Sequence, residues 1–121
     1  MPRKKILIVD DTAWNRDLLV QLLEDDYELV EAVDGEEGVR KAASEKPDLI
    51  LMDLGMPVMD GWEATRRIKA DPELKQIAVI AVTSHAMVGD ELHAREAGCD
   101  DYVAKPVDEI ELLEKIKRLL P

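Results

Sequence analysis

The chain has 121 residues, of which 46% are hydrophobic and 36% are charged, a composition typical of one folded domain and not of a disordered or membrane-spanning chain. Asp and Glu outnumber Lys and Arg by 27 to 16, and the resulting net charge of −11 argues against binding to nucleic acid or to an anionic membrane. The single cysteine, Cys99, excludes an intramolecular disulfide and any zinc site with several thiolates. The N-terminus lacks a secretory pattern, so we expect a cytoplasmic location.

Strand-like runs and helical repeats alternate along the first half of the chain. Residues 6–9 are continuously apolar, which is typical of a strand buried on both faces. Leucines at helical spacing follow over residues 18–23. Residues 27–33 predict a second strand near a sheet edge, Asp34-Gly35 predicts a turn, and residues 36–44 predict a short helix.

The second half repeats this alternation. Its predicted elements are a strand over residues 48–52, a helix over 62–69, a strand over 77–82, a helix over 86–97, a short strand over 102–104 and an amphipathic helix over 110–120. Met56-Pro57 and Asp60-Gly61 predict a loop, and Gly98 is expected to end the helix before it.

Five strands alternating with five helices predict an α/β fold, in which helices cover both faces of a doubly wound parallel sheet. We expect the flavodoxin-like strand order 2-1-3-4-5, with ligands bound at the carboxyl ends of the strands beside the switch between strands 1 and 3. We expect one domain over residues 1–121. Because the last helix runs to the end of the sequence, we expect no output domain.

Charged and hydroxyl side chains stand at the carboxyl ends of four of these strands. They are Asp10 and Asp11 after the first strand, Asp53 after the third, Thr83 after the fourth and Lys105 after the fifth. Each is ordinary when taken alone, since an Asp-Asp pair commonly caps a helix and Lys-Pro commonly forms a solvated turn. Their shared place in a parallel sheet predicts that three carboxylates, a hydroxyl and a lysine converge.

Such a cluster favours phosphoryl chemistry with a divalent cation. Carboxylates held close together repel, so one must take up a proton or a cation must lie among them. Mg²⁺ suits a few carboxylates together with an incoming phosphate. One carboxylate can then attack phosphorus to form an aspartyl phosphate, while a lysine and a hydroxyl contact the phosphoryl oxygens.

These residues, together with Met56-Pro57, Asp60-Gly61 and residues 102–106, resemble the receiver domain of two-component response regulators, the CheY-like superfamily. The resemblance covers essentially the whole chain. Residues 47–53 and 86–91 are especially similar to DivK-type single-domain regulators and to the receivers of hybrid histidine kinases.

The resemblance implies a role for each matched residue. The implied roles are phosphoacceptor for Asp53, Mg²⁺ ligands for Asp10, Asp11, Asp53 and the backbone carbonyl of Gly55, phosphate partner for Lys105, switch hydroxyl for Thr83 and switch aromatic for Tyr102. It also implies a histidine kinase or histidine phosphotransfer protein as phosphodonor, a downstream protein partner, and a monomer or a weak phosphorylation-dependent dimer. Such a domain catalyses its own phosphorylation and slow dephosphorylation but is not a conventional turnover enzyme.

Two other functions fit parts of the pattern. A Mg²⁺-dependent phosphohydrolase would need a substrate pocket and usually a cap domain, for which 121 residues leave no length. A receiver-like binding module would be expected to have lost the acceptor, a metal ligand or the lysine, and the sequence keeps all of them. We therefore favour a phosphorylation switch.

The switch is expected to change one surface, formed by the helix over residues 86–97, the strand that carries Tyr102 and the last helix. Charge added at Asp53 would draw Thr83 by a hydrogen bond and Lys105 by an ion pair. Movement of Thr83 would then leave space into which Tyr102 could turn from an exposed rotamer.

Overall fold

The computed structural model describes residues 3–54, 56, 59–83 and 95–120. Within these residues, the strands are β1 (Lys5–Val9), β2 (Glu28–Ala32), β3 (Leu49–Asp53), β4 (Ala78–Thr83) and β5 (Asp101–Ala104). They form one sheet in the order β2-β1-β3-β4-β5, and all neighbouring strands are parallel. The predicted fold class is confirmed, and β2 lies at an edge as expected.

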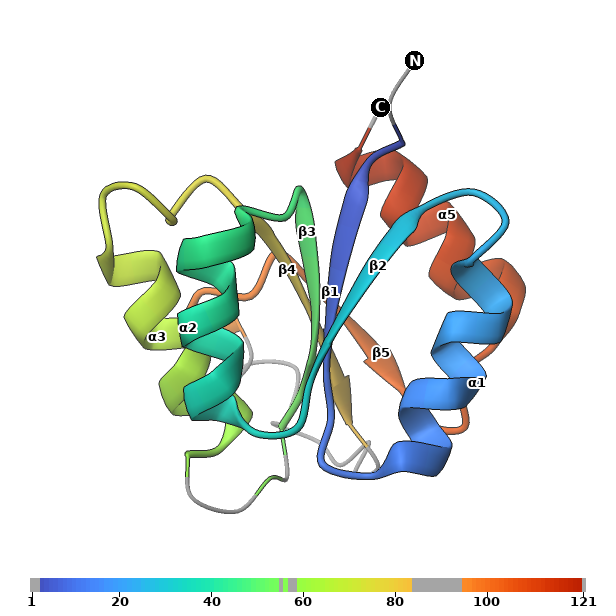
Figure 1. Cartoon of the computed structure of the whole chain (residues 1–121), viewed down its shortest axis with the longest axis horizontal. Coiled ribbons are helices and arrows are strands. Elements are labelled where there is room, and N and C mark those ends of the chain that lie inside the picture. Colours follow the sequence, from blue (N-terminus) through green and yellow to red (C-terminus); the bar gives the residue numbers. More distant parts are fainter. Residues whose placement is uncertain (1–2, 55, 57–58, 84–94, 121) are drawn as a thin grey trace.

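The helices cover both faces of the sheet. They are α1 (Ala13–Leu23), α2 (Gly35–Glu45), α3 (Gly61–Ala70) and α5 (Glu109–Leu119). Figure 1 shows α2 and α3 on one side of the sheet and α1 and α5 on the other. Most of the predicted helix over 86–97 lies outside the described residues, although residues 95–97 are helical and Gly98 follows them with a φ of 107°. None of the helices in the described ranges is long and apolar enough to cross a membrane.

Aspartates begin three of these helices. Asp34 accepts a hydrogen bond from the backbone N–H of Glu37 at 2.8 Å, and Asp60 accepts one from Glu63 at 3.0 Å; Asp108 caps α5 in the same way. The predicted turn at Asp34-Gly35 and loop at Asp60-Gly61 hold for the two aspartates and are wrong for the two glycines. Each aspartate is an N-cap, and the glycine after it is the first helical residue.

The sheet separates two hydrophobic clusters. One is built on Leu7, Ile50 and Ile68, on the side of α2 and α3, and the other on Ile8, Leu51 and Ile116, on the side of α1 and α5. All five residues of β3 are buried, and the first four of them form an unbroken apolar run. Burial of one large aliphatic side chain contributes about 1.5–3 kcal/mol, so this double-sided core holds the sheet edge in a fixed geometry.

The register of the sheet positions the ends of its strands. Asp53 of β3 lies beside Val82 of β4, and Thr83 lies beside Ala104 of β5. Asp53 and Thr83 are thus the last residues of their strands and not the first residues after them, because the parallel ladder continues one position further than the apolar pattern. The carboxyl ends of the strands lie together at the lower edge of the sheet in Figure 1.

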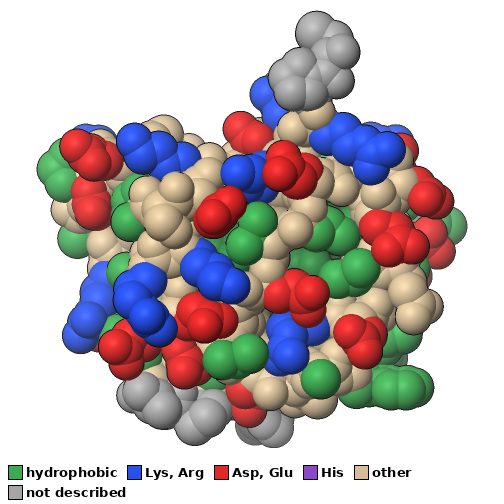
Figure 2. Space-filling model, viewed as in Figure 1, with side chains coloured by type: hydrophobic (Ala, Val, Ile, Leu, Met, Phe, Trp, Pro, Cys, Tyr) green, Lys and Arg blue, Asp and Glu red, His purple; other side chains and the backbone are tan. Residues whose placement is uncertain are grey.

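Charges of both signs cover the surface of the molecule. On the face shown in Figure 2, Lys and Arg side chains are scattered among Asp and Glu side chains, and among the atoms drawn in colour they do not gather into one basic patch. Several form ion pairs, such as Arg67 with Glu63 along α3 at 3.1 Å, and Lys69 of α3 with Asp100, just before β5, at 2.9 Å.

Candidate functional site

Three aspartates converge at the carboxyl edge of the sheet. Asp10 follows β1 and is 1% exposed, Asp53 ends β3 and is 7% exposed, and Asp11 is exposed. Each offers one carboxylate oxygen, and these three oxygens lie within 4.8 Å of one another. Because hard divalent cations take carboxylate oxygen ligands, this group of residues fits Mg²⁺.

Lys105 places a positive charge against two of the acids. Its Nζ lies 3.2 Å from Oδ2 of Asp10 and 3.6 Å from Oδ1 of Asp53. The backbone N–H of Lys105 donates to the carbonyl of Thr83. This hydrogen bond continues the pairing of β4 with β5, so it fixes the backbone position from which the Lys105 side chain extends. The structure therefore brings together Asp10, Asp11, Asp53 and Lys105, as expected.

Asp10 is held from several directions. Its backbone N–H donates to the carbonyl of Ala32 at 3.1 Å, which extends the β1–β2 pairing beyond β1. Its Oδ1 accepts a hydrogen bond from the N–H of Thr12 at 2.8 Å. Its carbonyl accepts one from Nη1 of Arg16 at 2.8 Å. Arg16 has no signal in the sequence that marks it as a site residue, because a lone arginine on an amphipathic helix is commonly a solvated residue.

The two predicted switch residues lie on one face of the sheet. Thr83 is 5% exposed, and Tyr102 lies beside Ala81 in the β4–β5 ladder. Side chains two residues apart on a strand share a face, so Thr83 and Tyr102 are diagonal neighbours. Tyr102 is half-buried and packs against the cluster under α2 and α3, whereas we expected an exposed rotamer. Gly55 and the greater part of the predicted helix over 86–97 lie outside the described residues.

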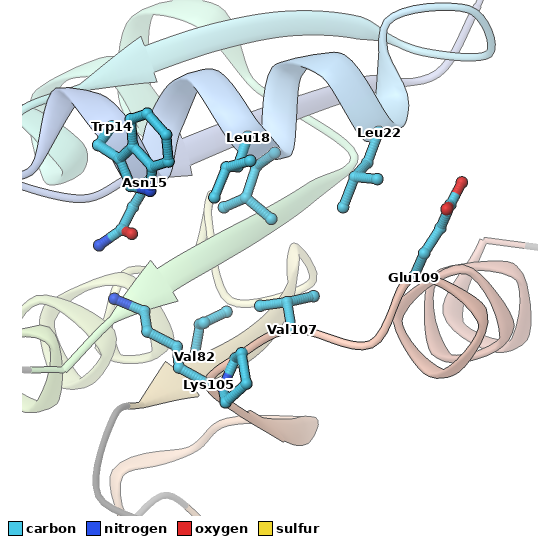
Figure 3. A pocket seen from close by; sticks show the side chains of 10 residues that line it. Trp14, Asn15, Leu18, Leu22, Val82, Lys105, Val107 and Glu109 are labelled. Carbon is cyan, nitrogen blue, oxygen red and sulfur yellow. The ribbon is translucent and has the colours of Figure 1, made fainter.

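An apolar groove of about 680 Å³ opens beside Lys105, between α1 and the segment that joins β5 to α5. Figure 3 shows Leu18 and Leu22 of α1 reaching across this groove toward Val107. Trp14 stands at one end and is 71% exposed. The groove and the acidic site therefore share one residue, Lys105.

Two titratable groups outside the acidic site have pKa values that their surroundings raise. Burial raises the pKa of the Cys99 thiol to about 11, against a weaker opposing effect of its hydrogen bond with Thr65. Burial also raises the pKa of Tyr27, as does the nearby charge of Asp26. Cys99 is thus a buried thiol that keeps its proton at neutral pH.

The fold, with acids and a lysine at this edge, defines the class of CheY-like α/β proteins. Comparison with known proteins makes the assignment specific, because residues 6–117 match the family model described as the response regulator receiver domain. The chain belongs to this family.

Known relatives agree with this membership. The chain is 42% identical over 118 residues to the polar-differentiation response regulator DivK of Brucella anthropi, an alignment that covers 97% of this chain and 96% of DivK. It is 36% identical, with a TM-score of 0.89 and 97% coverage of both chains, to the receiver domain of a sensor histidine kinase from Pseudomonas aeruginosa, whose crystal structure has magnesium coordinated in the active site cleft. It is 28% identical, with a TM-score of 0.90, to the chemotaxis protein CheY4 of Vibrio cholerae, covering 97% of this chain and 98% of that one.

Proposed function

We propose that this receiver domain accepts a phosphoryl group on Asp53 from a phosphohistidine of a histidine kinase or histidine phosphotransfer protein. The main support is the position of Lys105, whose Nζ lies within 4 Å of carboxylate oxygens of both Asp10 and Asp53. A metal site alone needs no lysine at this point, whereas a transferring phosphoryl group needs a cation beside the acceptor.

In the proposed reaction, a carboxylate oxygen of Asp53 attacks the phosphorus atom. A P–O bond forms, the P–N bond to the partner's histidine breaks, and the imidazole leaves with the electron pair of that bond and takes up a proton. Asp10, Asp11, Asp53 and the carbonyl of Gly55 would hold Mg²⁺, which would supply positive charge to offset the charge of the phosphoryl oxygens. Lys105 pairs with one phosphoryl oxygen, and the Thr83 hydroxyl donates a hydrogen bond to another. Hydrolysis of the acyl phosphate resets the domain, so it acts as a switch and not as a turnover enzyme.

The groove beside Lys105 suits the docking of the phosphodonor. It is lined mainly by apolar side chains of α1 and of residues 106–107, and an exposed Trp at its end is the kind of side chain that anchors protein interfaces. A donor bound there would lie next to Lys105 and so next to Asp53.

We propose that the output appears on β5 and α5 and on the predicted helix over residues 86–97. Support comes from the diagonal placement of Thr83 and Tyr102 on one sheet face. A downstream protein would bind the phosphorylated form better, which amounts to a population shift between two conformers. A cytoplasmic location is part of the same proposal, since histidine kinases use cytoplasmic ATP as their phosphoryl source.

The test uses acetyl phosphate as a small phosphodonor and measures intact mass. The wild type should gain one phosphoryl group with Mg²⁺ present and none after chelation. Asp53→Asn should gain none under either condition, while Asp71→Asn serves as a control because Asp71 lies at the C-terminal end of α3 and should leave phosphorylation unchanged. A phosphorylated Asp53→Asn protein at full yield would show that the acceptor lies elsewhere.

A further inference from the structure

The geometry points to Arg16 as a positioning residue that sets the Mg²⁺ affinity of the acidic site by holding the backbone of Asp10. This inference rests on the proposed function, since it concerns the metal site that the function requires. Nothing in the chain's family membership assigns Arg16 this role; it follows from the contacts of one half-buried guanidinium.

Arg16 connects three elements of the fold. Its Nη1 donates to the backbone carbonyl of Asp10 at 2.8 Å, and its Nε donates to Oε1 of Glu31 at 3.2 Å. Asp10 follows β1, Glu31 belongs to the edge strand β2, and Arg16 lies in α1. The arginine side chain is 16% exposed. A guanidinium held at two points with little access to water is pre-organised and acts as a rigid brace, unlike the exposed arginines of α3.

The two cations that contact Asp10 do so from different sides. Lys105 binds the carboxylate at Oδ2, whereas Arg16 binds the main-chain carbonyl. In the proposed reaction Lys105 turns to a phosphoryl oxygen and gives up its contact with Asp10. Among the described residues, hydrogen bonds with Ala32, Thr12 and Arg16 then still hold Asp10 in place. Of these, only the contact from Arg16 comes from a charged donor, and such hydrogen bonds are about twice as strong as neutral ones.

The residue next to this carbonyl is Asp11, the exposed member of the acidic group. A carbonyl fixed by Arg16 limits the rotation of the Asp10–Asp11 peptide, and so limits how far the Asp11 carboxylate can move from the other two. Metal affinity depends on such outer contacts, and their removal typically weakens binding by about 10–100-fold. We therefore expect the loss of Arg16 to weaken Mg²⁺ binding without removing any ligand.

The experiment compares wild type, Arg16→Ala, Arg16→Lys and Arg66→Ala. Arg66 is a matched control, because it pairs with Glu63 on the exposed face of α3, away from the acids. Mg²⁺ is titrated into each folded protein and its dissociation constant is read from tryptophan fluorescence or, if that signal is weak, from the Mg²⁺ dependence of thermal unfolding. The Mg²⁺ concentration that gives half the maximal phosphorylation rate with acetyl phosphate is measured in parallel.

Arg16→Ala should raise the Mg²⁺ dissociation constant about tenfold, with the half-saturating Mg²⁺ concentration rising equally and the rate at saturating Mg²⁺ staying within about twofold of wild type. Arg16→Lys should recover part of this affinity, because an ammonium can reach the carbonyl but lacks the planar fork that also binds Glu31. Arg66→Ala should match wild type. If Arg16→Ala does not fold, the Mg²⁺ dissociation constants of Arg16→Lys and Arg66→Ala are compared instead.

Unchanged Mg²⁺ affinity in a folded Arg16 variant would overturn the inference and leave the proposed function standing, even if that variant were less stable. A wild type that binds no Mg²⁺ would overturn both. A lower rate at saturating Mg²⁺ with an unchanged dissociation constant would also contradict the inference, because it would place Arg16 in the reaction and not in the support of the metal site.

Discussion

Lys105 and Asp53 are joined by an ion pair of 3.6 Å between Nζ and Oδ1 at the carboxyl edge of the sheet. Lys105 also contacts Asp10, so one ammonium faces a group of three carboxylates and the group keeps a net negative charge. Binding of a divalent cation would lower this negative charge, and transfer of a phosphoryl group to Asp53 would raise it. The net charge of the site therefore depends on what is bound there.

Mg²⁺ should stabilise the folded protein, because it relieves repulsion among Asp10, Asp11 and Asp53 in the folded state only. At a free concentration one hundred times its dissociation constant, Mg²⁺ should add about 2.7 kcal/mol to the free energy of unfolding. Asp11→Ala should remove most of this gain. Thermal unfolding with and without Mg²⁺ measures it, and melting temperatures that do not respond to Mg²⁺ would count against a metal site.

Gly61→Ala should damage both the fold and the site. A Cβ at Gly61 would lie 2.1 Å from the carbonyl oxygen of Asp53, which is backbone and cannot move aside easily. Relief of this clash should cost about 2 kcal/mol or more and displace Asp53. Gly38→Ala is the matched control in the first turn of α2, because its Cβ would meet only side-chain atoms of Val9, at 3.0 Å. Urea unfolding of both variants compares them, and equal losses would contradict this explanation.

The apolar runs in the sequence predicted the strands well, whereas the glycines at the helix starts were misleading. Buried parallel strands are continuous apolar runs, so residues 6–9 and 49–52 identified β1 and β3, and their ends located Asp10 and Asp53. Gly35 and Gly61 were misread as turn residues because glycine is a turn signal in sequence, whereas here each allows a helix to start in close contact with another backbone segment. That contact depends on packing and leaves no local pattern.

The site was predictable where residues stand at strand ends and unpredictable where helices contribute. Arg16 reaches Asp10 from α1, and the groove exists only because α1 lies against residues 106–107. Neither follows from spacing along the chain. The burial of Tyr102 depends likewise on the cluster beneath α2 and α3.

The free energy of unfolding should fall as pH rises through the window from about 9 to about 11, because the pKa of Cys99 is raised from 9.0 to about 11 in the folded state. In that window the folded thiol keeps its proton while the unfolded thiol loses it, so the unfolded state is favoured, by at most about 3 kcal/mol. In Cys99→Ala, the free energy of unfolding should fall less steeply with pH over this window. Urea unfolding as a function of pH measures it, and identical slopes for the two proteins would contradict the assignment.

Phosphorylation should loosen or reorder β5 and α5 more than α1. Thr83 and Tyr102 share a sheet face, and Lys115 of α5 contacts both the Tyr102 carbonyl and Asp101 of β5, so a shift of Tyr102 is transmitted to α5. Amide hydrogen exchange with and without beryllofluoride, a mimic of the phosphoryl group, reports this. Changes restricted to residues 13–23 would contradict the proposed output surface while leaving phosphorylation untouched.

The central claim is that Asp53 carries the phosphoryl group, and chemical mapping of the acyl phosphate tests it most directly. The protein is treated with acetyl phosphate and Mg²⁺ and then with borohydride, which reduces an aspartyl phosphate to homoserine but leaves free carboxylates unchanged. Peptide mass spectrometry should find homoserine at position 53, and only when Mg²⁺ was present. Homoserine at position 10 or 11, or unmodified Asp53 in protein that gained phosphoryl mass, would contradict the account.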